Sequence, residues 1–324
     1  MSRTGLTARV REEAARLLAD GKVDVVIGFE QGSLPLRATP CFVSDAADAG
    51  RLVWNSFCGN NLSRYIRRFD KRIGIVAKGC DTRSIVELIK ENQVKRENLV
   101  IIGVPCDGMV DGSILHRVCG VREILSVEER EGFLIVADAV RTVSIPRDEC
   151  LHQGCRVCTQ RNPVIHDVLA GEPVQELPRD TYLDVTGFAA APPGERWARI
   201  TGEMDRCIRC YACRDACPLC YCANCFVDAT MPQWVGKSVG GSDTLSFHLM
   251  RSLHLAGRCV ECGACERACP MGVDIRTLHR KVSSDVAGMF GYRPGMSLSE
   301  PAPLSCFEPD DPEDFMTGRS PCAE

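Results

Sequence analysis

The chain has 324 residues of ordinary globular composition, of which 45% are hydrophobic and 25% charged. Its formal net charge of −4 argues against nucleic acid as the main partner, because phosphate contacts require a basic surface. It contains 21 cysteines, no uninterrupted apolar run long enough to span a membrane, and a charged N-terminus without signal-peptide character. We therefore expect a cytoplasmic protein whose thiols serve metal or redox chemistry rather than disulfide bonds.

Residues 1–170 are predicted to form an α/β domain with a partly parallel sheet. Apolar residues at helical spacing predict a helix over 6–19. The helical stretch 84–94 connects two predicted strands, which indicates a crossover and hence a parallel pair. Continuous β-branched runs predict strands over 23–29, 51–55, 73–77 and 99–104, and two strands joined by a tight turn over 133–145.

Several cysteines of this domain fall just past predicted strands. Cys58, Cys80 and Cys106 each follow one, and ligands collect at the C-terminal edge of a parallel sheet. A later C-x2-C pair, Cys155 and Cys158, would fold onto the same edge. We expect Cys80, Cys106, Cys155 and Cys158 to form a four-thiolate site. The alternative is that Cys80 and Cys106 are small buried hydrophobic residues.

The segment after Cys80 suits the start of a helix. Asp81, Thr82 and Ser84 are typical of helix N-termini, where unpaired N–H groups bind anions. With Arg83 adding positive charge, this segment would hold a flavin phosphate. The alternative is simple helix capping.

Residues 171–194 are rich in proline and glycine and are predicted to be a linker. Residues 195–290 follow as a mainly helical, cysteine-rich domain. Within it, residues 242–257 are predicted to form a helix that is capped by Ser242 and ends at Gly257. Its predicted apolar face consists of Leu245, Leu249, Leu253 and Ala256.

Two runs in this domain, CIRCYACRDACP (207–218) and CVECGACERACP (259–270), share the pattern C-x2-C-x2-C-x3-C-P. This is the spacing of bacterial iron–sulfur proteins, in which three cysteines hold one cluster and the fourth holds its neighbour. Zinc usually takes two separated C-x2-C pairs, and disulfides need an oxidising compartment. We therefore expect two [4Fe–4S] clusters, the first held by Cys207, Cys210, Cys213 and Cys269, and the second by Cys259, Cys262, Cys265 and Cys217.

Three further cysteines, Cys220, Cys222 and Cys225, directly follow the first run. They would either hold a further cluster or a zinc ion with help from elsewhere, or shield the two clusters. His248 and His254 lie six residues apart on different faces of the predicted helix, so we expect packing or surface roles for them.

Residues 291–324 form a proline-rich acidic tail. We expect it either to be disordered or to dock on a partner through Phe307, Phe315 and Met316.

Residues 70–170 resemble the β-subunit family of coenzyme F420 hydrogenases and formate dehydrogenases, through IVAKGCDTRSIVELI, LVIIGVPCDGM and GCRVCTQRNPVIHDVLAG. The paired cysteine runs and the helix between them make residues 200–285 similar to the α-helical ferredoxin domain of heterodisulfide reductase small subunits and succinate dehydrogenase iron–sulfur subunits. The first resemblance implies FAD and one or more clusters, with a third [4Fe–4S] cluster on Cys80, Cys106, Cys155 and Cys158.

These features predict an iron–sulfur electron-transfer subunit of a multi-subunit oxidoreductase of the heterodisulfide reductase, formate dehydrogenase or hydrogenase kind. The resemblance implies catalytic or flavin-bifurcating subunits as partners. No acid–base pair or nucleophile stands out, so we assign no bond-making chemistry to the chain. The alternative is a flavin-containing subunit that itself reduces a small-molecule or deazaflavin acceptor. A third possibility is a zinc-binding module without redox activity.

Overall fold

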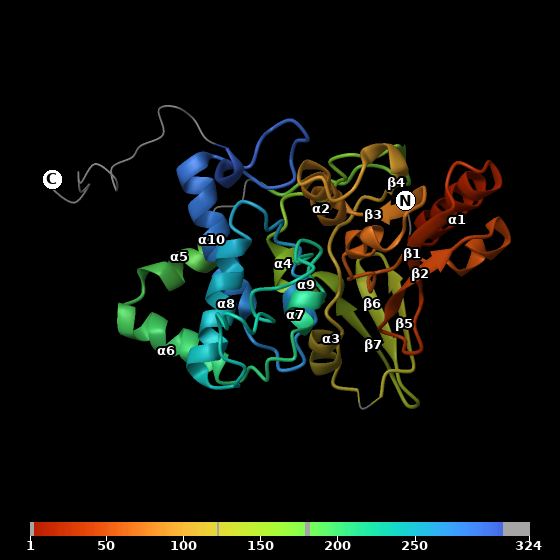
Figure 1. The fold of residues 1–324 in the computed structure, drawn as a ribbon. Helices are drawn as coiled ribbons and strands as arrows, with labels where there is room; N and C mark the ends of the chain where they lie inside the picture. Colours follow the sequence, from red (N-terminus) through yellow and green to blue (C-terminus); the bar gives the residue numbers. More distant parts are fainter. Residues whose placement is uncertain (1–2, 122, 179–181, 307–324) are drawn as a thin grey trace.

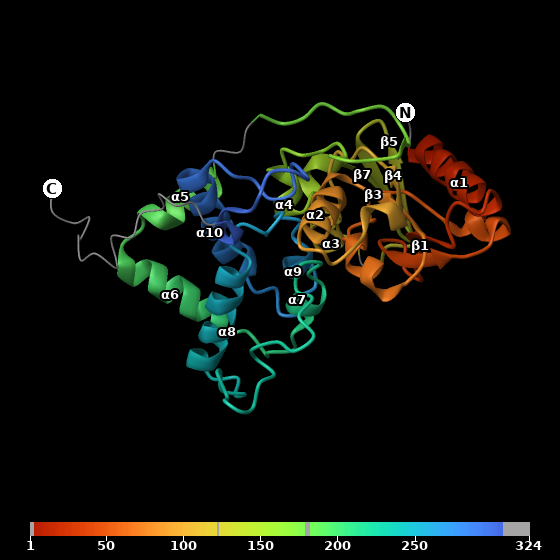
Figure 2. The same cartoon turned by 45° about the horizontal axis from the view of Figure 1, so that its top comes forward.

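The computed structural model describes residues 3–121, 123–178 and 182–306. An α/β N-terminal part and a helical C-terminal part lie side by side (Figures 1 and 2). Between them, in both views, lie the short helices α4 (Gln153–Arg156), α7 (Ala212–Asp215) and α9 (Ala264–Arg267). This confirms the predicted fold class. The tail residues Phe307, Phe315 and Met316 lie outside the described residues. Within the described ranges, no helix is long and apolar enough to cross a membrane.

A five-stranded sheet forms the core of the N-terminal part, in the order β2-β1-β3-β4-β8. Strands β1, β3, β4 and β8 run parallel, and β2 pairs antiparallel with β1 at one edge. All five residues of β3 are buried, as expected for a strand covered on both faces. The predicted parallel pair is confirmed, with Ile73 opposite Leu99. The strands are β1 (Val25–Gln31), β2 (Ala38–Val43), β3 (Ile73–Ala77), β4 (Leu99–Gly103) and β8 (Val168–Leu169).

The predicted strand at 51–55 is wrong. Leu52 makes only an isolated bridge to Glu30, and the strand that pairs with β1 is β2 instead. Side chains of the first helix form hydrogen bonds with the backbone of this segment. The hydroxyl of Thr7 accepts from the N–H of Trp54 and donates to its carbonyl, and Arg11 donates to the carbonyl of Leu52. Leu52 and Trp54 are therefore buried without belonging to a ladder.

A second sheet of three antiparallel strands, β5-β6-β7, lies beside the first. It confirms the two strands joined by a turn within 133–145, where Asp138 accepts hydrogen bonds from the N–H groups of Val140 and Arg141. The additional strand β5 was missed, since its sequence SVEER is mostly charged. The bounds are β5 (Ser126–Arg130), β6 (Phe133–Ala137) and β7 (Thr142–Pro146).

Helix α2 begins at Gly79, earlier than the predicted stretch 84–94, so Cys80 lies in its first turn. Helix α1 confirms the prediction for 6–19, and Leu6, Val10, Ala14 and Leu17 are buried against the sheet. The helices of this part are α1 (Arg3–Ala19), α2 (Gly79–Lys90), α3 (Gly112–Cys119) and α4 (Gln153–Arg156). The 3-10 helices are η1 (Ala46–Arg51), η2 (Leu62–Arg68), η3 (Arg96–Asn98) and η4 (Arg147–Cys150).

The C-terminal part packs α8 against α6 and α10, and α7 against α9. Helix α5 lies within the stretch 171–194 that was predicted to be a linker. The elements are α5 (Leu183–Ala190), α6 (Pro193–Met204), α7 (Ala212–Asp215), α8 (Gly241–His254), α9 (Ala264–Arg267), α10 (Ile275–Phe290) and η5 (Pro303–Ser305).

Helix α8 exists where it was predicted, but its orientation was predicted wrongly. It begins at Gly241 without a side-chain cap, so Ser242 lies inside its first turn. Leu249 and Leu253, assigned to the apolar face, are 41% and 59% exposed. The buried residues are Thr244, Phe247, His248, Arg251 and Ser252. The helix therefore turns a polar face toward the cysteine-bearing loops.

Candidate functional site

The two cysteine runs adopt the same backbone conformation. In the first, Arg209 and Tyr211 have φ angles of 51° and 59°; in the second, Glu261 and Gly263 have 59° and 68°. Positive φ is uncommon for residues other than glycine, and it is found where successive N–H groups turn inward around an anion. Each loop leads into a one-turn helix, α7 or α9, and these two helices pack together. The sequence repeat is thus a structural repeat with inward-turned loops.

The first loop gathers its three cysteines together with Cys269 of the second run. Burial raises the pKa of the Cys207 thiol, and the nearby Cys269 and Cys210 raise it further. Burial raises the pKa of Cys213 to about 12, to which Cys207 and Cys269 also contribute. Cys269 accepts a hydrogen bond from the N–H of Val273 at 3.3 Å. These four thiols are the set predicted for the first cluster.

The second loop gathers its cysteines together with Cys217 of the first run. Burial raises the pKa of Cys259 well above its ordinary value, and Cys265 and Cys217 lie close enough to add to this rise. Burial raises the pKa of Cys262 as well, and the nearby Cys217 adds to this rise. The structure therefore brings each fourth cysteine to the other loop, as the spacing predicted. Which clusters these thiols hold stays a prediction.

The four cysteines predicted to form a site in the N-terminal part line one cavity. Cys80 follows β3, Cys106 follows β4, and Cys155 and Cys158 come from α4 and the turn after it. Cys262 of the second quartet lines the same cavity. Three cations, Lys78, Arg161 and Arg267, also line it and would offset thiolate charge.

Buried N–H groups that lack an acceptor surround these thiols. Among the described residues, such atoms include Arg83 Nη2, Arg161 Nε, Arg209 Nε and Arg251 Nε. Buried donors in proteins are almost always satisfied, and the sulfur atoms of iron–sulfur clusters accept hydrogen bonds of this kind. The donor set therefore fits clusters at the thiol groups. In the part of the chain that the structure describes, no three His, Cys, Asp or Glu side chains are arranged around a single metal ion.

Two buried histidines contact this region. His248 Nε2 lies 3.4 Å from the sulfur of Cys207, a contact that the expectation of a packing or surface role missed. Burial, with the charges of Arg251 and Arg209, lowers the pKa of His248 to about 4, so the ring is neutral at pH 7. His279 on α10 lies 2.9 Å from Nη1 of Arg251. His254, by contrast, is exposed.

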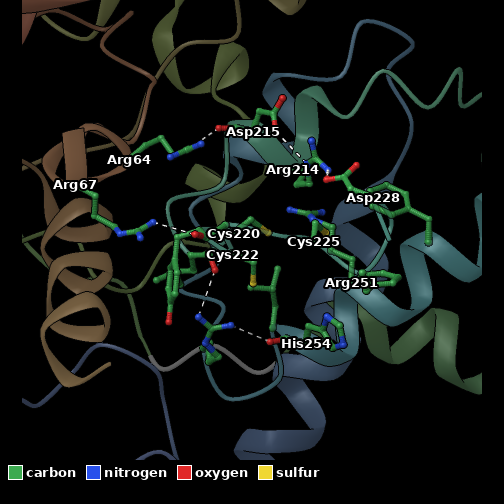
Figure 3. Close-up of a pocket in the computed structure, with 17 residues that line it drawn as sticks. Arg64, Arg67, Arg214, Asp215, Cys220, Cys222, Cys225, Asp228, Arg251 and His254 are labelled. Carbon is green, nitrogen blue, oxygen red and sulfur yellow. Dashed lines mark hydrogen bonds and ion pairs between the residues drawn. The ribbon is translucent and has the colours of Figure 1, made fainter. Parts of the chain in front are cut away.

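The three extra cysteines line a separate pocket of about 350 Å³ between the two parts of the protein (Figure 3). Arg64 and Arg67 enter it from η2, where Arg64 Nε donates to the carbonyl of Asp215 at 2.6 Å. Cys220 connects this pocket to the second quartet, since its thiol is hydrogen-bonded to Cys217. The thiols on the wall are Cys220, Cys222 and Cys225. Their role as a further site stays a prediction.

The residues predicted to hold a flavin phosphate are buried at the start of α2. Asp81 pairs with Lys78 at 2.9 Å, and the hydroxyl of Ser84 donates to the carbonyl of Cys80. The hydroxyl of Thr82 donates to the carbonyl of Gly79. Arg83 donates to carbonyl oxygens of the C-terminal part. These contacts are those of helix capping and domain docking, and the flavin site stays a prediction.

Helix α2 also carries many of the contacts between the two parts, beside those of Arg64, Arg67 and Arg267. Arg83 donates to the carbonyls of Val260 and Pro294 at 3.1 and 2.9 Å. Glu91, just past the helix, pairs with Arg258 and accepts from the hydroxyl of Tyr221 at 2.7 Å. Glu87 accepts from the hydroxyl of Tyr292 and the N–H of Gly295. One helix therefore fixes the N-terminal cavity to the second quartet.

Comparison with known protein families confirms the two resemblances. Residues 70–184 match the family that comprises the C-terminal region of the beta subunit of coenzyme F420 hydrogenase/dehydrogenase. Residues 206–274 match a 4Fe-4S dicluster domain. The chain thus carries an iron–sulfur dicluster domain joined to a domain of the β-subunit kind.

Curated relatives align over most of the chain. An F420-dependent formate dehydrogenase subunit beta from Methanocaldococcus jannaschii is 23% identical, covering 88% of this chain and 91% of the relative. An F420-dependent formate dehydrogenase 1 subunit beta from Methanococcus maripaludis is 26% identical, covering 89% and 90%. A chain of the F420-reducing [NiFe] hydrogenase complex from Methanosarcina barkeri aligns with a TM-score of 0.38 at 15% identity, over 48% of this chain and 59% of that one.

Proposed function

We propose that this chain is the iron–sulfur electron-transfer subunit of a multi-subunit oxidoreductase of the formate dehydrogenase kind, and that it carries electrons between a catalytic partner and a deazaflavin acceptor. The two curated relatives, matched over nine-tenths of their length, support the class of complex. The single observation that carries the proposal is that three sets of cysteines, the four of the N-terminal cavity and the two quartets, lie in a continuous series.

The three sets of cysteines are neighbours in the structure. The N-terminal cavity and the second quartet share Cys262 on one wall. The second and first quartets approach each other at Cys265 and Cys213. These two thiols are close enough that Cys265 raises the pKa of Cys213, and the charge of Arg251 acts on both. An iron–sulfur cluster, when bound, accepts and releases one electron at a time. Three groups in series would therefore pass single electrons across the protein.

The residues of the chain would supply the environment of this series. The quartets would hold two [4Fe–4S] clusters, and Cys80, Cys106, Cys155 and Cys158 a third. Burial raises the pKa of Cys80, Cys158, Cys207, Cys213, Cys259, Cys262 and Cys265, so these thiols would bind as thiolates only when iron displaces the proton. Surrounding cations and N–H groups would then offset the negative charge and set the potentials.

The decisive experiment is anaerobic purification of the chain with its partner subunits, followed by quantification of iron, acid-labile sulfide and flavin. We expect about twelve irons per chain, with sulfide in equal amount. The reduced complex should give cluster signals by electron paramagnetic resonance (EPR) when formate is the only reductant. A colourless preparation without inorganic sulfide would contradict the proposal.

FAD is part of the proposal because the family resemblance implies it. Flavin retained by the complex in a fixed ratio to this chain would support FAD, whereas its absence from an active complex would remove FAD but leave the iron–sulfur relay. Turnover of a soluble deazaflavin by the isolated chain, without partners, would instead favour a self-contained flavoenzyme.

A further inference from the structure

Arg251 is buried in a helix that exposes leucine. The residue is 3% exposed, whereas Leu249 and Leu253 of the same helix face solvent. An amphipathic helix normally does the reverse, and arginine is almost never fully buried unless it is paired. A negative charge in the interior must therefore compensate Arg251.

No carboxylate among the described residues provides that charge. Arg251 Nη2 donates to the carbonyl of Cys213 at 3.0 Å, and Nη1 lies 2.9 Å from His279 Nε2. Its Nε has no acceptor in the described ranges. Burial lowers the pKa of His279 well below its usual range, with help from Arg251, so this partner is neutral. Both of these contacts are to uncharged groups. Arg251 is also hydrogen-bonded to Cys220, whose pKa the hydrogen bond to Cys217 and then the charge of Arg251 lower to about 7. The compensating charge must therefore come from thiolate sulfur rather than from a carboxylate.

Two of the other buried arginines show the contrast, whereas Arg83 and Arg209 have no carboxylate partner among the described residues and donate to backbone carbonyls. Arg280 pairs with Asp184 at 2.7 Å, and Arg147 pairs with Glu129 at 3.2 Å. Each of these guanidinium groups has a carboxylate at hand, as buried arginine normally does.

The charge that Arg251 faces comes from thiols of both quartets and from Cys220. Arg251 donates to the carbonyl of Cys213, and it lines a pocket with Cys220, whose N–H donates to the carbonyl of Cys217 at 3.3 Å. The charge of Arg251 also acts to lower the pKa of the Cys213, Cys217 and Cys265 thiols. Cys213 belongs to the first quartet, and Cys217 and Cys265 belong to the second. One guanidinium therefore lies between the two groups and interacts with both.

We propose that the positive charge of Arg251 acts on both clusters of the dicluster domain and raises the reduction potential of each. The inference rests on the proposed function, because it requires a cluster at each quartet. Reduction adds one electron, and hence one unit of negative charge, to a cluster. A fixed cation nearby stabilises that added charge, and in a buried site it is little screened by water.

The test is a redox titration of Arg251→Gln and Arg251→Lys variants in the full chain with its partner subunits, followed by EPR. Arg206→Gln is the matched control, since this arginine belongs to the same part of the chain, has a side chain 49% exposed and pairs with Glu203. In Arg251→Gln we expect both clusters to be harder to reduce. At a fixed solution potential the ratio of reduced to oxidised cluster should fall about tenfold, which is about 59 mV for a one-electron couple. Arg251→Lys keeps the charge on a shorter side chain and should shift both potentials in the same direction by less.

Unchanged potentials in Arg251→Gln, or a shift of one cluster alone, would overturn the shared role. A shift of the same size in the reduction potentials of Arg206→Gln would also overturn it, because loss of any positive charge from the protein would then have the same effect. If the Arg251→Gln variant does not assemble its clusters, the test rests on Arg251→Lys. A fall in both reduction potentials of that variant supports the proposal, and unchanged potentials overturn it. A wild-type preparation with fewer than two clusters would contradict the proposed function itself, before any variant is compared.

Discussion

His248 Nε2 lies 3.4 Å from the sulfur of Cys207, on the buried face of α8. A polar group that touches a ligand atom orients it, and loss of such a partner typically costs about 10–100-fold in metal affinity. We expect His248→Phe to release iron from the first cluster to a chelator at least about tenfold faster, while the second cluster is retained. His254→Phe, on the same helix but exposed, is the control and should behave as wild type. Equal iron loss in the two variants would show that the contact is only packing.

Replacement of Cys217 should damage the cluster built on the other run. In the structure this thiol lies with Cys259 and Cys262, although it follows Cys213 in sequence. We expect Cys217→Ser to remove or convert the EPR signal of the second cluster and to leave that of the first. Cys222→Ser is the matched control, because Cys222 is an exposed thiol of the same segment. Loss of the first signal would mean that each run holds its own cluster.

Replacement of Cys80 should affect only the N-terminal site. Cys80 is half-buried and lines the same cavity as Cys106, Cys155 and Cys158. We expect Cys80→Ser to lower the iron content from about twelve to about eight per chain, with both dicluster signals preserved. Cys119→Ser controls for loss of a buried thiol, since Cys119 lies in a different core. Disappearance of a dicluster signal in Cys80→Ser would show that the centres are not separate.

The ion pair between Glu91 and Arg258 should stabilise the docking of the two parts. Both side chains are about three-quarters buried or more, and Glu91 also accepts from Tyr221. We expect Glu91→Gln to lower the free energy of unfolding by about 2 kcal/mol, because it leaves a largely buried guanidinium without its counter-charge. Glu12→Gln, which breaks an exposed pair with Arg9, should cost about 0.5 kcal/mol or less. Anaerobic denaturant titration measures both, and equal values would contradict the docking role.

His279 should make stability depend on pH below neutrality. Burial, then the charges of Arg251 and His248, lowers its pKa well below 6.5 in the folded protein. The unfolded chain therefore binds a proton between about pH 7.5 and 5.5 that the folded chain does not, so the free energy of unfolding falls as the pH falls. We expect this residue to contribute a loss of about 1 kcal/mol over that window, which His279→Gln should remove. The same slope in the variant and the wild type would show that another group is responsible.

The sequence predicted those features that depend on local pattern. The strands β3 and β4 are continuous apolar runs, and the exchange of Cys217 and Cys269 follows from the spacing of each run. The face of α8 was mispredicted because hydrophobic periodicity assumes a purely hydrophobic interior, whereas this interior also contains cysteines of both runs. Here Arg251 and His248 are buried, and no single-sequence pattern distinguishes such a helix from an ordinary one.

The segment around Leu52 and Trp54 shows a second limit. Its residues have the character of a strand, but Thr7 and Arg11 of α1 supply the partners that a neighbouring strand would have provided. The pocket lined by Cys220 and Arg64 could not be predicted either, because its walls come from segments far apart in the chain that only the docked structure brings together.

Helix α2 has one further consequence. Its first turn carries Cys80, and Glu87 near its end is hydrogen-bonded to Tyr292 and Gly295 of the C-terminal part. The separation between the proposed centres is thus held by one continuous helix, together with the contacts of Arg64 and Arg267 between the two parts, and electron tunnelling rates depend steeply on separation. Internal transfer should therefore be insensitive to solvent viscosity, and any gating of electron flow must occur where the partner subunits associate.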